Sequence, residues 1–94
     1  MTPLAELSRL LALTDDPHLV EEALCALLTP SEADDLSARW ELVKRLDQGE
    51  TQRRIAKELR LSLCKITRGS RELKKPGSAL KALLNLRRHM PRND

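Results

Sequence analysis

TQRRIAKELRLSLCKITRGSRELK, residues 51–74 of this 94-residue chain, is the stretch that decides the fold we expect. Apolar residues at helical spacing predict a short helix at about 52–58 and a second helix at about 63–74. Between them, Arg60-Leu61-Ser62 indicates a tight turn, and Ser62 can cap the second helix. Two short helices joined in this way match a helix-turn-helix in length.

Basic and polar side chains crowd this segment. The first turns of its second helix carry Lys65, Thr67 and Arg68, and the N-terminal residues of a recognition helix meet base edges in the major groove. Lysine and arginine bond guanine acceptors or phosphates, while Gln52 and Thr67 can bond bases, phosphates or ordered water. An ordinary pair of core helices with a basic exposed face is the alternative. The residues that we expect to contact DNA are Gln52, Arg53, Arg54, Lys57, Leu63, Cys64, Lys65, Thr67, Arg68 and Arg71.

The charge of the chain changes sign at the start of this segment. Residues 1–50 carry a net charge of −7 and residues 51–94 carry +10, which gives +3 overall. A basic half on a small domain suggests a polyanionic partner such as nucleic acid. From charge alone, a solvated surface is an equally good interpretation.

Three start signals for helices precede the basic segment. Thr2-Pro3 and Asp16-Pro17 each place a capping side chain directly before a proline at the first helical position. Thr29-Pro30-Ser31-Glu32 is a capping box, in which the threonine oxygen serves the glutamate amide and the carboxylate reaches back. The third helix is expected to run to Gly49, a glycine stop.

A sixth helix should follow the basic segment. Pro76-Gly77 breaks the preceding helix, Ser78 begins the last one, and we expect that helix to fray at Pro91. No stretch shows the alternation of a strand. We therefore predict an all-α fold of six short helices, as a single helical domain over residues 1–94. Oligomerisation would add burial that so short a chain lacks.

Several classes of protein do not fit these residues. No apolar run approaches the roughly 18–20 residues of a membrane span, and the N-terminus lacks the pattern of a secretory signal. Cys25 and Cys64 lie far apart, so we expect two unpaired thiols in a cytoplasmic protein. His18 and His89 form no metal-ligand spacing with them. We expect no metal, no membrane partner and no enzymatic activity, since no nucleophile–base set is discernible.

A series of short motifs follows one another in order from about Ala26 to Lys75. They are Leu28-Thr29-Pro30-Ser31-Glu32, Arg39, Gly49-Glu50-Thr51-Gln52-Arg53, Ile66-Thr67-Arg68-Gly69-Ser70 and Leu73-Lys74. In this order and spacing, the series resembles the bacterial tryptophan repressor family. The resemblance implies an intertwined all-helical homodimer that binds L-tryptophan as corepressor and a palindromic operator in double-stranded DNA. It also implies that the regulated genes serve tryptophan synthesis or salvage.

The resemblance assigns four residues to the indole ring of the ligand. Arg39 and Arg68 would sandwich the ring, because a guanidinium stacks on an aromatic face for roughly 0.5–2 kcal/mol, and Arg68 would also bond the carboxylate. Val43 and Gly69 would bound the ring. Alternatively, Arg39 is a solvated surface arginine, Val43 is plain core, and Arg68 serves DNA phosphate. A mid-helix glycine such as Gly69 costs about 1 kcal/mol relative to alanine, which favours a packing or ligand reason for it.

The same resemblance places the ligand ammonium group at the end of the second helix. Free main-chain carbonyls of Ala26, Leu28 and Thr29 would accept it, because the C-terminal end of a helix dipole attracts a cation. Glu72 stands near that group, where the family usually has serine. Its carboxylate could accept the ammonium, or it could fold back onto Arg68 and compete with the ligand.

Other departures from the family pattern affect the DNA-binding segment. The loop at Gly49-Glu50-Thr51-Gln52 is one residue shorter, and Cys64 and Lys65 replace small or hydroxylated residues. Two alternative functions therefore stay open. One is a DNA-binding protein of the same fold that does not respond to tryptophan. The other is a helical adaptor whose basic half meets an acidic protein.

Overall fold

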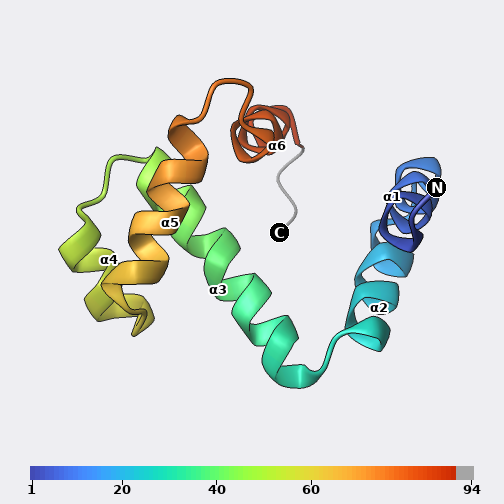
Figure 1. Ribbon diagram of the computed structural model, residues 1–94, viewed down its shortest axis with the longest axis horizontal. Helices are drawn as coiled ribbons and strands as arrows, with labels where there is room; N and C mark the ends of the chain where they lie inside the picture. The colour runs from blue at the N-terminus through green and yellow to red at the C-terminus, as the bar shows by residue number, and fades with distance from the viewer. Residues whose placement is uncertain (91–94) are drawn as a thin grey trace. The chain divides into compact units, whose positions relative to one another are not determined.

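The computed structural model describes residues 1–90, and within them six helices follow one another with no strand (Figure 1). They are α1 (Pro3–Leu13), α2 (Pro17–Leu27), α3 (Pro30–Asp47), α4 (Gln52–Leu59), α5 (Leu63–Lys74) and α6 (Ala79–Arg87). The predicted all-α fold with six helices is confirmed. The fraying expected at Pro91 falls outside the described residues. None of the helices described is long and apolar enough to cross a membrane.

The chain divides into two compact units, Met1–Asp35 and a second one that begins at Leu36. In the first unit, side chains cap each helix start as expected. The Ala5 amide donates to Thr2 Oγ1 at 3.0 Å, and the amides of Thr29 and Glu32 bond each other's side chains at 2.8 and 3.1 Å. These bonds satisfy amide groups that a helix leaves free at its first turn.

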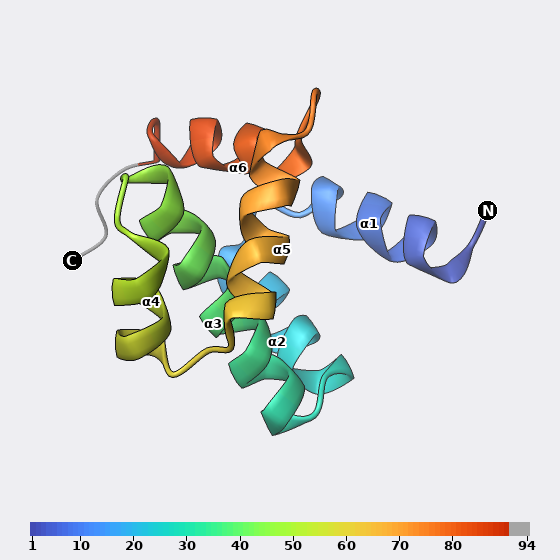
Figure 2. The ribbon, with the colours of Figure 1, turned by 60° about the vertical axis from the view of Figure 1, so that its left-hand side comes forward.

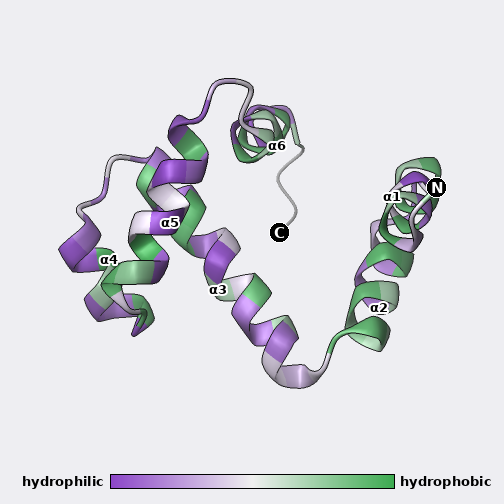
Figure 3. Cartoon of the chain, in the orientation of Figure 1, coloured by the Kyte–Doolittle hydropathy of each residue, from purple (hydrophilic) through white to green (hydrophobic). Residues whose placement is uncertain are grey.

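The first unit exposes its apolar side chains. No residue of α1 or α2 is buried, and Leu13 and Leu27 are 81% and 64% exposed. Figure 3 shows hydrophobic residues along both helices. An apolar stripe of this kind usually packs against another element.

The second unit holds the core. Leu42 of α3, Ile55 of α4 and Ile66 of α5 are fully buried in one cluster, and Leu84 of α6 is buried as well. Figure 2 shows α4 beside α5, which contacts both α4 and α6. These contacts assemble the helix pair on a scaffold made of α3 and α6.

The predicted turn between the two short helices is confirmed. Arg60 follows α4 in the left-handed conformation, with φ 55° and ψ 40°, and its amide bonds the carbonyl of Ala56. Ser62 then caps α5, accepting a hydrogen bond from the Lys65 amide at 3.4 Å. Three residues therefore connect α4 to α5, which is the length of turn typical of a helix-turn-helix.

Candidate ligand pocket and DNA-binding surface

Residues of α3, α5 and α6 in the second unit line an apolar, partly open pocket of about 350 Å³. This volume is at the small end of the roughly 300–1,000 Å³ that ligand pockets occupy. Leucine side chains, Val43 and the half-buried Trp40 form most of its wall. The charged side chains at the pocket are Arg39, Lys65, Arg68 and Glu72.

Five of the eight residues expected at a tryptophan site line this one pocket: Arg39, Val43, Arg68, Gly69 and Glu72. Two of them come from α3 and three from α5, so α3–α5 packing brings them together.

The other three expected residues, Ala26, Leu28 and Thr29, belong to the first unit, at the end of α2 and the start of α3. The expectation that all three carbonyls are free is wrong for Thr29. Its carbonyl accepts a hydrogen bond from the Ala33 amide at 2.9 Å, because Thr29 begins the next helix.

Gly69 allows α5 to lie close to α3. A Cβ atom at this position would meet Leu42 Cδ2 at 3.3 Å and Leu46 Cδ1 at 3.6 Å. Leu42 is only 1% exposed, so it has little room to move. The structure thus supplies the packing reason for a glycine within the helix.

Glu72 is bonded to the residue that directly follows its helix. Lys75 Nζ donates to Glu72 Oε1 at 2.8 Å, so the pair forms toward the end of α5 rather than with Arg68. The hydrogen bond from Lys75 lowers the pKa of Glu72, and the charge of Arg68 lowers it further. The carboxylate is therefore ionised near neutral pH.

A second, shallower hollow lies along the face of α5 that carries the expected base contacts. Its lining residues are Leu63, Cys64, Thr67, Arg68, Arg71, Glu72 and Lys75. The first five were all predicted to contact DNA. Thr67 Oγ1 donates to the carbonyl of Leu63 at 2.8 Å, which leaves the lone pairs of its oxygen available as acceptors.

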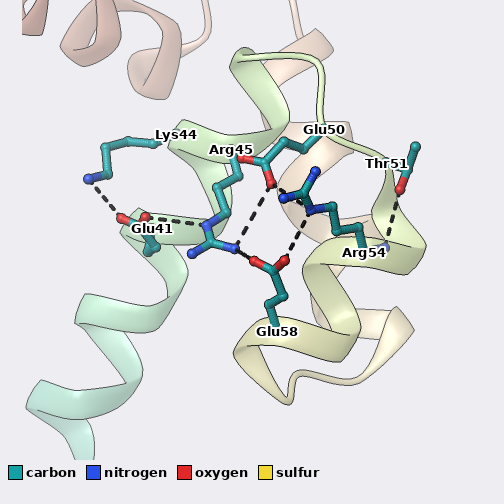
Figure 4. A network of polar contacts seen from close by, with 7 residues as sticks. All are labelled: Glu41, Lys44, Arg45, Glu50, Thr51, Arg54 and Glu58. Atoms are coloured by element: carbon teal, nitrogen blue, oxygen red, sulfur yellow. Dashed lines mark hydrogen bonds and ion pairs between the residues drawn. The ribbon is translucent and has the colours of Figure 1, made fainter.

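The α4 residues predicted to contact DNA, Gln52, Arg53, Arg54 and Lys57, are all exposed. Arg54 is also part of an ion-pair network between α3 and α4 (Figure 4). Its Nε atom lies 3.0 Å from Glu58 Oε1, and Glu58 pairs as well with Arg45 of α3. This network holds α4 against the scaffold.

Two features of the site were not predicted from the sequence. Lys65, expected only at the DNA, lines the apolar pocket, and Lys75 pairs with Glu72. The spacing of three residues between Glu72 and Lys75 could have indicated that pair. The place of Lys65 depends on how α5 packs on α3. Among residues 1–90, no three metal-ligating side chains lie together.

Comparisons with known proteins agree with this architecture. The family model described as "Trp repressor protein" matches residues 2–88. A protein called "Trp operon repressor homolog" from Vibrio parahaemolyticus is 40% identical over 72 residues, covering 76% of this chain and 70% of the relative. Its namesake from Vibrio cholerae is 45% identical over 65 residues, covering 68% of this chain and 63% of the relative. No solved structure was found to match.

Proposed function

Because the chain belongs to the Trp repressor family of DNA-binding, non-enzymatic transcription regulators, we propose that it represses its target genes with L-tryptophan as corepressor. The target genes serve tryptophan synthesis or salvage. Residues 51–74 bind a palindromic operator, and the whole chain acts as one domain within an intertwined homodimer. Its DNA partner and free amino-acid ligand locate this activity in the cytoplasm.

The pocket of the second unit supports the proposed binding of L-tryptophan. Arg39 and Arg68 come from different helices and line the same apolar hollow, as stacking on an indole ring requires. Arg68 is also available for the ligand carboxylate, and Glu72 for the ammonium group. The pocket combines cationic side chains, one carboxylate and an apolar wall. This combination complements L-tryptophan, which is a zwitterion with an apolar ring.

The outer face of α5 supports the proposed binding of DNA. Thr67 and Arg71 line its hollow, and the exposed Arg53 and Lys57 of α4 add positive charge. In a helix-turn-helix protein, the second helix enters the major groove while the first crosses the backbone. A two-fold dimer presents two such helix pairs, so its operator is palindromic.

Tryptophan acts by a shift of population. The ligand favours the arrangement that fits DNA only to the extent that it binds this arrangement more tightly than the others. Pocket and DNA surface share helix α5, so an occupant of the pocket contacts the helix that reads the operator.

Calorimetry with L-tryptophan, followed by a DNA-retardation assay, tests the proposal. The probe is a duplex enriched from random-sequence DNA by the protein in the presence of L-tryptophan. We expect heat on ligand binding and retardation that depends on the ligand. Retardation without ligand dependence would instead favour a DNA-binding protein that ignores tryptophan, and no retardation would favour a protein adaptor.

The variant Arg39→Ala should weaken L-tryptophan binding about 2- to 30-fold, which corresponds to the stacking energy of one guanidinium. Arg9→Ala removes the same charge from an exposed position on α1 and is the matched control. Equal affinity in the two variants would remove Arg39 from the site.

A further inference from the structure

Arg68 and Glu72 stand on the part of α5 that separates the two hollows. Both residues line the pocket formed with α3 and α6, and both also line the outer hollow together with Thr67, Arg71 and Lys75. A ligand in the pocket and a phosphate at the outer face would therefore meet the same two side chains.

Glu72 is the only carboxylate among the described residues that line either hollow. Its partner Lys75 belongs to the outer hollow, at 2.8 Å. This ion pair neutralises a lysine on the face offered to DNA. It also places a carboxylate where a phosphate would approach, and like charges repel.

We propose that Glu72 couples the charge of the ligand to the charge of the DNA-binding surface. An ammonium group in the pocket takes over the Glu72 carboxylate, and Lys75 is released to bind a DNA phosphate. The proposal rests on the proposed function and adds to it the release of Lys75.

The pair is suited to such an exchange of partners. The side chains of Glu72 and Lys75 are 39% and 61% exposed, and ion pairs this open to solvent are weak. The side-chain ammonium of Lys75 and the ammonium group of the ligand would compete for the carboxylate of Glu72. The ammonium has the advantage of a ring already held in the apolar pocket, which fixes its position.

The salt dependence of DNA binding measures the exchange directly. Each additional phosphate contact steepens the logarithmic salt slope by about 0.9. The proposed homodimer contributes one Lys75 from each copy, so with wild-type protein and the enriched duplex, saturating L-tryptophan should steepen the slope by about 1.8. Indole-3-propionate has a similar ring and carboxylate but no ammonium group. It should bind the pocket, as calorimetry will show, and leave the slope unchanged.

Two variants separate the roles of the pair. Glu72→Gln should have the steeper slope without any ligand, and L-tryptophan should steepen it no further. Lys75→Gln should keep the shallower slope with and without L-tryptophan. Glu21→Gln, at an exposed position on α2, changes the net charge as Glu72→Gln does and should behave as wild type. Circular dichroism verifies that each variant is folded.

The outcomes distinguish failure of the Glu72 coupling from failure of the proposed function. If L-tryptophan gives no heat with wild-type protein, the proposed function and the coupling both fail. If it gives heat but steepens the slope equally in wild type and Glu72→Gln, only the coupling fails. Equal steepening by indole-3-propionate and L-tryptophan also overturns the coupling.

Discussion

Gly69 occupies the point at which α5 comes close to the buried surface of α3. Its missing side chain leaves room for Leu42 and Leu46, and the residue also lines the apolar pocket. One residue therefore controls both the spacing of two helices and the shape of the hollow between them.

The variant Gly69→Val should lower the free energy of unfolding by about 1–3 kcal/mol, the usual range for overpacking. Its branched side chain would be forced against Leu42, which is fully buried. Urea unfolding at a fixed protein concentration measures the effect. In a Leu42→Ala background, the penalty should shrink, and an undiminished penalty would show that the two positions are not coupled.

Arg60 holds an unfavourable backbone conformation in the turn between α4 and α5. A side chain in the left-handed region costs roughly 1–2 kcal/mol, and Arg60 has φ 55°. Arg60→Gly should therefore raise the free energy of unfolding by about 1 kcal/mol. Arg60→Val should lower it, since a branched side chain suits this region least. Thermal unfolding of the three proteins at equal concentration measures both changes.

Helix α4 has only eight residues, too few to be stable in isolation. Ile55 anchors it in the core, and Thr51 caps it by accepting the Arg54 amide at 3.2 Å. A further tie is the network in which Glu58 joins Arg54 to Arg45 of α3 (Figure 4). The position of α4 thus depends on interactions beyond its own sequence.

Removing the central carboxylate of this network should loosen α4 selectively. In Glu58→Gln, we expect the amides of α4 to exchange hydrogen a few-fold faster, while those of α5 are unchanged. High salt should accelerate α4 exchange in the wild type, because it screens exposed ion pairs, and should add little in the variant. Uniform acceleration in both helices would mean that the network stabilises the unit as a whole.

Carboxylates that tie α3 to its neighbours have lowered pKa values. Hydrogen bonds from Arg54 and Arg45 lower the pKa of Glu58, and a hydrogen bond from Lys81 of α6 lowers the pKa of Asp47. A carboxylate whose pKa is lowered in the folded state stabilises that state at pH values above the ordinary pKa of the group. The contribution is lost as pH falls through the lowered value.

Stability should therefore decline as pH falls from about 5 downward. Urea unfolding across this range measures the decline, which should be smaller in Asp47→Asn because that variant has already lost the pair between Lys81 and Asp47 at 2.6 Å. Parallel declines in the two proteins would exclude Asp47 as a source of the acid sensitivity.

The exposed leucines of the first unit concern the assembly of the molecule. Leu13 and Leu27 lie on helices without a buried residue, and a second copy of the chain would cover such stripes. Light scattering should give twice the chain mass of 10.7 kDa. The double variant Leu13→Glu, Leu27→Glu should shift the mass toward one chain, whereas a single-chain mass for the wild type would refute the dimer.

The sequence alone determined the six helices, because the signals that start and stop a helix act over a few residues. Thr29 and Glu32 cap each other three residues apart, and Ser62 caps α5 in the same way. The motif with Arg68 and Gly69 was also recognisable without coordinates, since a family resemblance depends on residue order.

Only the tertiary structure decided which helix faces meet. Packing of α5 on α3 brought Lys65 into the pocket that Arg39 also lines, and packing of α4 on α3 joined Arg54, through Glu58, to Arg45. Helical periodicity tells which residues share a face but not which neighbour that face will contact. That choice follows from burying Leu42, Ile55 and Ile66 together, a condition on residues far apart in the chain.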